Sequence, residues 1–208
     1  MTTGAQAPFE AVVLAAGAGS RFGGGKLLAP FEGGVLLDGA LRAALAAPAR
    51  SVTVVTGADA EAVAAAARAH AEAAGQSRRL RVLHAPDHAL GMGASLRRAA
   101  LELPQDAGGV FVFLGDMPHI PSAVLSPLAQ AVRDGAPAAA AAFQGRRGHP
   151  ALIGAGLFPA LRTLAGDEGA RAVLRGLGER LALVETQDAG VLFDVDTPAD
   201  LGRPGLDS

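Results

Sequence analysis

The sequence contains no cysteine, which excludes a disulfide scaffold, a zinc site built on thiolates and a cysteine nucleophile. Tryptophan and tyrosine are also absent and only 8 phenylalanines occur, so aromatic platforms for stacking nucleic-acid bases are not expected. The net charge of −2 over 208 residues provides no basic field that would attract nucleic acid or an anionic membrane. No apolar run is long enough to span a bilayer, and residues 1–10 lack the basic and apolar regions of a secretory signal. We therefore expect a cytoplasmic protein with no nucleic-acid partner and no membrane partner.

Short apolar runs, each ending in turn residues and each followed by a helical stretch, organise the first part of the chain. The apolar runs occupy residues 12–16, 52–55, 80–83 and 110–114, and the helical stretches occupy residues 41–47, 59–74, 94–103 and 122–133. The runs are continuously apolar rather than alternating, which is typical of strands that are covered on both faces. Strands and helices in this rhythm predict βαβ units and a mostly parallel sheet.

The second part of the chain is less regular. Apolar segments occupy residues 138–143, 181–184 and 191–195, and helical stretches occupy residues 157–164 and 170–176. No linker composition divides the chain, so residues 1–208 are expected to form a single domain. The predicted architecture is a three-layer α/β/α, Rossmann-like fold. Ligands of open α/β sheets bind beyond the carboxyl ends of the strands, so the turns after the apolar runs are expected to carry the chemistry.

The turn after the first apolar run is rich in glycine and carries two cations, Arg21 and Lys26. Glycines allow backbone N–H groups to converge on an anion, so this composition is typical of a phosphate site. Two common phosphate motifs nevertheless do not fit. A dinucleotide fingerprint would need glycine in place of Phe22, and a P-loop would need different residues in place of Ser20 and Leu27. The alternative interpretation is a flexible loop whose basic side chains are solvated.

An aspartate, Asp116, stands just beyond the apolar run at residues 110–114. An Asp emerging from a buried strand is well placed to bind Mg²⁺, which takes few protein carboxylates and completes its shell with water and phosphate oxygens. The alternative role for Asp116 is to cap the next helix or turn. The two turns support each other, because one offers phosphate donors and the other offers a ligand for a hard cation.

Six short segments, taken together, resemble one known family. Residues 14–26 read Leu-Ala-Ala-Gly-x-Gly-x-Arg-Phe-Gly-x-x-Lys, and residues 115–118 read Gly-Asp-Met-Pro. Four others are Gly-Met-Gly-Ala-Ser-Leu at 91–96, Gly-His-Pro at 148–150, Gly-Asp-Glu-Gly-Ala-Arg at 166–171 and Asp-Val-Asp-Thr-Pro-Ala-Asp at 194–200. In their order along the chain, these segments resemble the molybdenum cofactor cytidylyltransferases, which are nucleotidyltransferases of the glycosyltransferase-A-like fold. The resemblance runs from about residue 11 to residue 201 and implies a nucleotide-diphospho-sugar transferase type of α/β fold.

The resemblance implies transfer of CMP from CTP to the terminal phosphate of molybdopterin, with release of pyrophosphate and with Mg²⁺ as cofactor. The implied nucleotide-binding residues are Leu14, Ala15, Ala16, Gly17, Ala18, Gly19, Lys26 and Ser95. The implied catalytic residues are Arg21, Lys26 and Asp116, and the implied metal ligands are Asp116 and Asp196, with Asp194 as the second choice. The implied acceptor-binding residues are His149, Asp167 and Arg171.

The nucleotide preference rests on Ala16, which stands where related guanylyltransferases carry glycine. A Cβ beside the base leaves less room for a purine, so the resemblance favours cytidine. Two alternatives remain open: a guanylyltransferase acting on the same acceptor, and a non-catalytic factor that delivers the cofactor to a molybdenum hydroxylase. A plain NAD-binding Rossmann protein is disfavoured by the failed dinucleotide fingerprint.

Several implied site residues also have structural interpretations. His149 precedes a proline and could be a turn histidine. Asp167 could cap a helix that continues through Arg171, with the two side chains paired at the surface. Asp194 or Asp196 could cap a helix beginning near residue 198.

Overall fold

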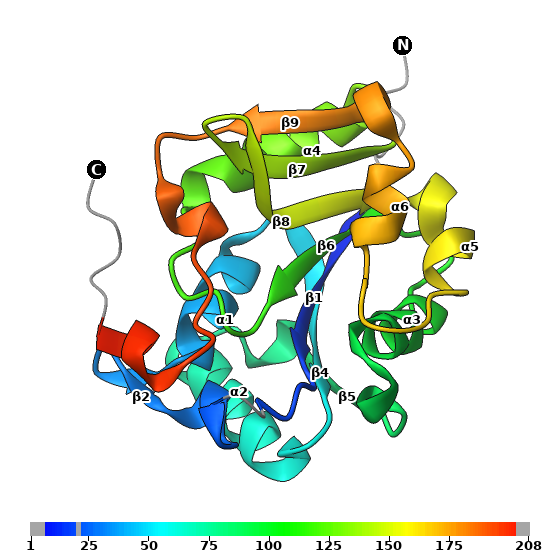
Figure 1. The fold of residues 1–208 in the computed structure, drawn as a ribbon. Helices are drawn as coiled ribbons and strands as arrows, with labels where there is room; N and C mark the ends of the chain where they lie inside the picture. Colours follow the sequence, from blue (N-terminus) through cyan, green and yellow to red (C-terminus); the bar gives the residue numbers. More distant parts are fainter. Residues whose placement is uncertain (1–6, 20–21, 203–208) are drawn as a thin grey trace.

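The computed structural model describes residues 7–19 and 22–202. At its centre is a seven-stranded sheet with the strand order β5-β4-β1-β6-β8-β7-β9 (Figure 1). Its strands are β1 (Phe9–Ala15), β4 (Ala49–Thr56), β5 (Leu80–His84), β6 (Gly109–Leu114), β7 (Ala138–Phe143), β8 (Arg146–Gly154) and β9 (Leu181–Glu185). Strand β8 pairs antiparallel with β6 and β7, whereas the other neighbouring strands pair parallel. The predicted, mostly parallel sheet is therefore confirmed.

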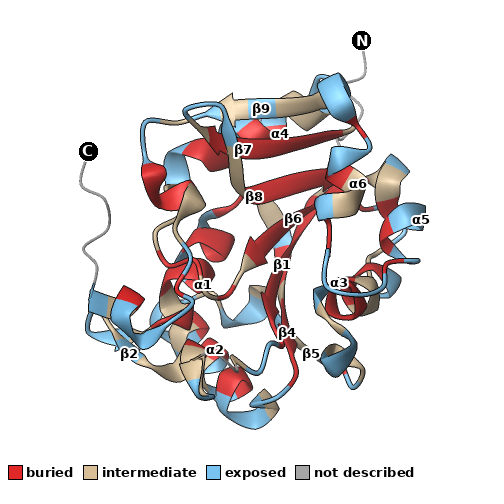
Figure 2. Cartoon of the chain, in the orientation of Figure 1, coloured by how far each residue is buried: buried red, intermediate tan, exposed pale blue. Residues whose placement is uncertain are grey.

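Helices cover both faces of this sheet, as a three-layer fold requires. One face contacts α1 (Leu37–Ala46), α2 (Ala60–Ala73) and α4 (Leu125–Arg133), and the other contacts α3 (Met92–Leu101), α5 (Phe158–Leu161) and α6 (Arg171–Arg175) (Figure 1). Alternate residues of β1 enter the two cores: Val13 packs toward α1 and α2, and Val12 packs toward α3. Burial on both faces explains why the strand sequences are continuously apolar, and Figure 2 shows β1 and β6 buried along their length.

Two of the predicted helices, at residues 59–74 and 122–133, end next to the glycines that follow them in the sequence. Gly75 and Gly135 follow α2 and α4 with positive φ angles of 66° and 105°, a conformation that glycine adopts without steric cost. Within the described ranges, no helix combines the length and the apolar character needed to cross a bilayer. A small antiparallel pair, β2 (Pro30–Phe31) and β3 (Gly34–Val35), lies outside the main sheet.

Three segments of the second half differ from the sequence-based expectation. Residues 146–154 form β8, where only a motif was recognised, because the first half of this strand is polar. The apolar segment 191–195 is not a strand: it continues from a 3-10 turn, Ala189–Leu192, and crosses the end of the sheet. Val191 is fully buried in the core, so the apolar character of this segment reports burial rather than strand pairing. The helical stretch at 157–164 shortens to α5, a single turn preceded by a 3-10 turn.

Candidate active site

The carboxyl ends of β1 and β6 open into a cavity of about 490 Å³. The residues implied for nucleotide binding and catalysis that line this cavity are Leu14, Ala16, Gly17, Ala18, Gly19, Lys26, Ser95 and Asp116. Ala15 differs, because its side chain is buried in the core on the opposite face of the sheet. Arg21, the other cation predicted in this turn, lies outside the described residues. The cavity thus brings together the glycine-rich turn, the start of α3 and the aspartate that follows β6.

The backbone of the glycine-rich turn holds Lys26 against the cavity. Gly19 has a φ of 58°, and a Cβ at this position would lie 2.9 Å from the Cβ of Lys26. The carbonyl oxygen of Gly19 accepts hydrogen bonds from the N–H groups of Phe22 at 2.9 Å and Gly24 at 3.2 Å, which closes the turn. A side chain at Gly19 would therefore displace the lysine as well as strain the backbone.

Lys26 lies between carboxylates that come from distant parts of the chain. Its Nζ donates to Asp116 Oδ2 at 2.7 Å and lies 3.8 Å from Asp196 Oδ1. Asp196 reaches this place because Val195 N donates to the carbonyl oxygen of Asp116 at 3.0 Å. Burial, followed by the negative charges of Asp196 and Asp116, raises the pKa of the Asp194 carboxyl. Among the described residues, the cluster thus places one cation, Lys26, between carboxylates.

The turn that carries Asp196 is held by Asp200, the last residue of the recognised segment 194–200, to which the sequence analysis assigned no role. The Asp200 carboxylate accepts from the N–H of Asp196 at 3.2 Å, from the N–H of Thr197 at 2.8 Å and from the Thr197 hydroxyl at 2.7 Å. Asp200 therefore takes the capping role that we considered for Asp194 or Asp196.

The carboxylates fit a divalent metal ion that is shared with a phosphate ligand. Across the described part of the chain, no group of three or more His, Asp or Glu side chains is arranged to hold a metal ion by itself. Mg²⁺ and Mn²⁺ need no such cage, because they accept one or two carboxylates and complete their shells with water and phosphate oxygens. Asp116 and Asp196 both approach Lys26 Nζ, so their oxygens face a common point.

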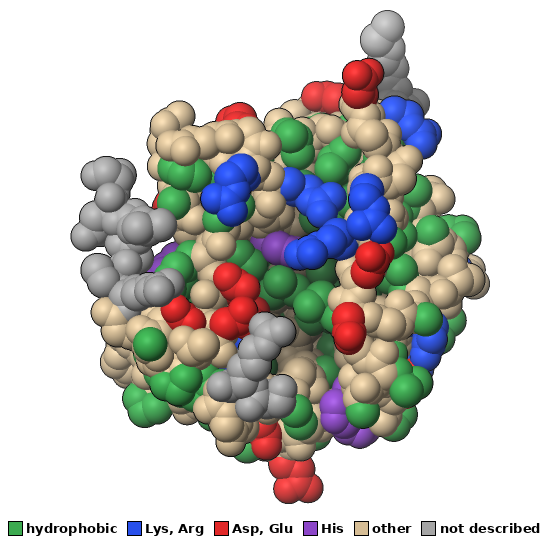
Figure 3. Space-filling view, viewed as in Figure 1, with side chains coloured by type: hydrophobic (Ala, Val, Ile, Leu, Met, Phe, Trp, Pro, Cys, Tyr) green, Lys and Arg blue, Asp and Glu red, His purple; other side chains and the backbone are tan. Residues whose placement is uncertain are grey.

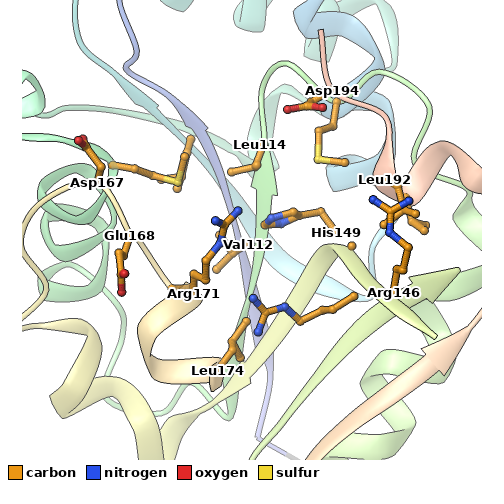
Figure 4. A pocket seen from close by; sticks show the side chains of 17 residues that line it. Val112, Leu114, Arg146, His149, Asp167, Glu168, Arg171, Leu174, Leu192 and Asp194 are labelled. Carbon is orange, nitrogen blue, oxygen red and sulfur yellow. The ribbon is translucent and has the colours of Figure 1, made fainter. Parts of the chain in front are cut away.

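A second cavity, of about 350 Å³, lies beside the first, and three arginines line it together with three carboxylates. Arg146 and Arg147 line it from β8, and Arg171 lines it from α6. His149 lies between Arg146 and Arg171 (Figure 4). Figure 3 shows basic side chains along one rim of a hollow and acidic side chains along the opposite rim. Burial and the nearby charges of Arg171 and Arg175 lower the pKa of Arg147. An anion bound here would relieve this mutual repulsion.

His149 lies beside the arginines of the second cavity but carries no charge itself. Burial, with smaller contributions that include the charges of Arg147 and Arg171, lowers its pKa to about 4. Its Nδ1 atom is shielded from solvent and has no hydrogen-bond partner among the described residues. At neutral pH the ring is therefore neutral and keeps an unused polar atom at Nδ1.

The two cavities share a wall. Its residues are Leu14, Met92, Leu114 and Asp167. The loop carrying Asp167 sits on the start of α3, because Gly93 N donates to the carbonyl oxygen of Gly166 at 2.8 Å, and a Cβ at Gly91 would overlap the Asp167 carboxylate. Helix α6 begins at Arg171 after Ala170, with no side-chain cap, so Asp167 is not the helix cap that we considered.

Comparison with known proteins gives the family. The profile described as the MobA-like NTP transferase domain matches residues 11–184. The chain belongs to this family of nucleotidyltransferases. The match confirms the resemblance drawn from the sequence motifs and, with the sheet described above, the predicted fold class.

Solved and curated relatives of this MobA-like transferase agree with that assignment. Rv0371c from Mycobacterium tuberculosis H37Rv superposes with a TM-score of 0.76 at 26% identity, covering 94% of this chain and 96% of that chain. A complex of Rv0371C with manganese has a TM-score of 0.73 at 26% identity, covering 93% and 95%. The purine catabolism protein PucB of Bacillus subtilis (strain 168) is 33% identical over 96 residues, which is 45% of each chain. The matched segments span less than half of the curated relatives.

The structure of this MobA-like transferase brings all the described candidate residues to the two cavities or to the Lys26 cluster, apart from the side chain of Ala15. It also adds residues that sequence reasoning did not assign. His88, Ala89 and Met92 line the first cavity, and Glu168 lines the second. Met92 follows the glycine of a recognised motif, so its position was available from the sequence. His88 lies outside every recognised segment, and only the packing reveals it.

Proposed function

We propose that this nucleotidyltransferase transfers CMP from CTP to the terminal phosphate of a molybdopterin-type acceptor and releases pyrophosphate. One observation carries the proposal: a glycine-lined cavity and an arginine-lined cavity share a wall, with Lys26 and Asp116 bordering the first and Asp194 bordering the second. Two substrates bound side by side would place an acceptor anion next to the nucleotide phosphates. Positioning of this kind supplies much of the rate enhancement in phosphoryl-type transfers.

In the proposed reaction an oxygen of the acceptor phosphate attacks the α-phosphorus of CTP in line. A new P–O bond forms as the bond from the α-phosphorus to the bridging oxygen breaks, and that oxygen leaves with pyrophosphate. The acceptor phosphate is already ionised, so the site needs no general base. Lys26 and the backbone N–H groups of the glycine-rich turn would stabilise the charge that develops on the leaving group. Mg²⁺ or a similar divalent ion, held by Asp116 and Asp196, would neutralise phosphate charge.

The acceptor would occupy the second, arginine-lined cavity. Arg146, Arg147 and Arg171 offer planar, multi-donor guanidinium groups that suit a phosphate. His149, which is neutral, would add a single hydrogen bond to the pterin part rather than a further charge. Asp167, which borders both cavities, would contact the acceptor beside the nucleotide.

The remaining features of the proposal follow from the family resemblance. The base is cytosine, because Ala16 lines the first cavity with a Cβ where a purine would need room. Residues 1–208 act as one catalytic domain in the cytoplasm, and a molybdenum hydroxylase receives the product.

Replacing Arg171 with alanine is expected to raise the KM for the acceptor at least about tenfold, because a charge-assisted hydrogen bond to phosphate contributes about 1.5–3 kcal/mol. The KM for CTP should stay near the wild-type value, since Arg171 borders only the second of the two cavities. Steady-state kinetics with each substrate varied in turn measures both constants. Arg98→Ala is the matched control, because Arg98 is paired with Glu102 on an exposed helix face. Equal increases in both KM values would contradict the assignment of Arg171 to the acceptor.

Pyrophosphate release tests the proposed function directly. Purified protein, Mg²⁺ and molybdenum-loaded molybdopterin are combined with CTP, GTP, ATP or UTP in separate reactions. Release with CTP alone is the expected result. Release with GTP would keep the mechanism and make the protein a guanylyltransferase. Nucleotide binding without release would support the delivery factor instead.

A further inference from the structure

His88 lies where three neighbouring parallel strands end. Ala16 follows β1, Gly57 follows β4, and His88 begins the 3-10 turn (His88–Leu90) after β5. A Cβ at Gly57 would lie 2.6 Å from His88 Cγ and 2.8 Å from Ala16 Cβ. The histidine ring and the Ala16 methyl group therefore flank the same small space, which only glycine leaves open. Both residues line the first cavity.

The orientation of the His88 ring is set by its own turn. His88 Nδ1 lies 3.0 Å from the carbonyl oxygen of Ala85, a fully buried residue. A carbonyl oxygen can only accept a hydrogen bond, so Nδ1 must carry the proton. In the neutral imidazole Nε2 then has a free lone pair and acts as an acceptor. The backbone N–H of His88 also donates to the Ala85 carbonyl at 3.2 Å, which fixes the start of the turn.

We propose that His88 selects the nucleotide base, with Nε2 accepting a hydrogen bond from an exocyclic amino group. This inference rests on the proposed nucleotidyl transfer and concerns the nucleotide side of the same site. Cytosine and adenine carry an amino group at the corresponding edge, whereas uracil and guanine carry a carbonyl oxygen whose lone pairs would face that of Nε2. Ala16 limits the size of the base, and His88 requires a hydrogen-bond donor at the edge of the base. Of the four common bases, only cytosine satisfies both restrictions.

Equilibrium binding of CTP and UTP, measured with Mg²⁺ and without an acceptor, tests the role of His88. Wild-type protein should bind CTP about tenfold more tightly than UTP, the factor that one net hydrogen bond supplies. His88→Phe keeps a ring of similar shape but removes the acceptor, so the two affinities should become nearly equal. His88→Gln retains an acceptor oxygen and should restore part of the preference. His84→Phe is the control, because His84 is an exposed neighbour whose ring centroid lies 6.4 Å from that of His88.

Thermal melts establish that each variant is folded before its affinities are compared. The inference is overturned if wild-type protein binds CTP and UTP equally, or if folded His88→Phe keeps the wild-type preference. In either case CTP binding itself would remain, so the proposed transfer would stand. Failure of the wild-type protein to bind any nucleoside triphosphate would instead overturn the proposed function together with this inference.

Discussion

Replacement of Lys26 with alanine is expected to lower the rate of nucleotidyl transfer by about 100- to 1000-fold, the usual cost of removing one preorganised donor from developing charge. Lys26 is the only lysine in the sequence, and its Nζ lies in the cavity at 2.7 Å from Asp116. No other lysine can therefore take over its role. Initial rates of pyrophosphate release under saturating CTP and acceptor measure the effect. A fully active Lys26→Ala enzyme would show that the leaving phosphates are stabilised elsewhere.

A loss of activity in this variant must be separated from a loss of folding. Without Lys26 the charges of Asp116, Asp194 and Asp196 repel each other more strongly, so the metal-free variant should melt at a lower temperature at neutral pH. Added Mg²⁺ should recover part of this loss if the carboxylates bind the ion. Lys26→Arg keeps the charge on a differently shaped group and is expected to retain intermediate activity.

The stability of the wild-type protein should fall relative to His149→Gln as the pH is lowered from about 6.5 to about 4. The pKa of His149 is about 4 in the folded protein and near 6.5 in the unfolded chain. Within this window the unfolded chain binds the proton and the folded protein does not, so acid favours unfolding. Below pH 4 the wild-type protein should have lost at most about 3 kcal/mol of unfolding free energy relative to His149→Gln.

Urea unfolding of the two proteins at a series of pH values measures this effect. The difference between them is the relevant quantity, since the other titrating groups are common to both. His84→Gln, which changes an exposed histidine, controls for the removal of any imidazole. If the free energy of unfolding of wild type and His149→Gln changes with pH in the same way, the His149 ring is accessible to protons in the folded state.

The first half of the fold could be predicted from the sequence because its strands are buried on both faces. Such strands must be continuously apolar, and the runs near residues 12–16, 52–55 and 110–114 became β1, β4 and β6. Strand β8 could not be predicted in this way. Its first residues line the second, arginine-lined cavity and are polar, so they lack the apolar signal of a strand. The apolar segment 191–195 gave the opposite error: it was predicted to be a strand and is not one, because apolar residues indicate burial and not strand pairing.

The centre of the candidate site was also predictable, for a topological reason. Lys26 and Asp116 are 90 positions apart, yet each follows a strand of one parallel sheet, and neighbouring parallel strands end at the same edge. The candidate residues of the second cavity came only from the family resemblance. Strand β8 pairs with β6 and β7, and α6 packs on the sheet, and no local pattern describes these contacts between distant segments.

By itself the sequence determined the class of fold, the glycine-rich turn and the aspartate that faces it, because apolar periodicity and turn chemistry act over a few neighbouring residues. The tertiary structure decided which distant groups share a solvent-shielded space. It left His149 neutral between arginines, set Asp167 on the wall between two cavities and placed His88 beside Ala16 at the first cavity. Desolvation and contact between remote segments exist only after the layers have packed, so no local pattern can encode them.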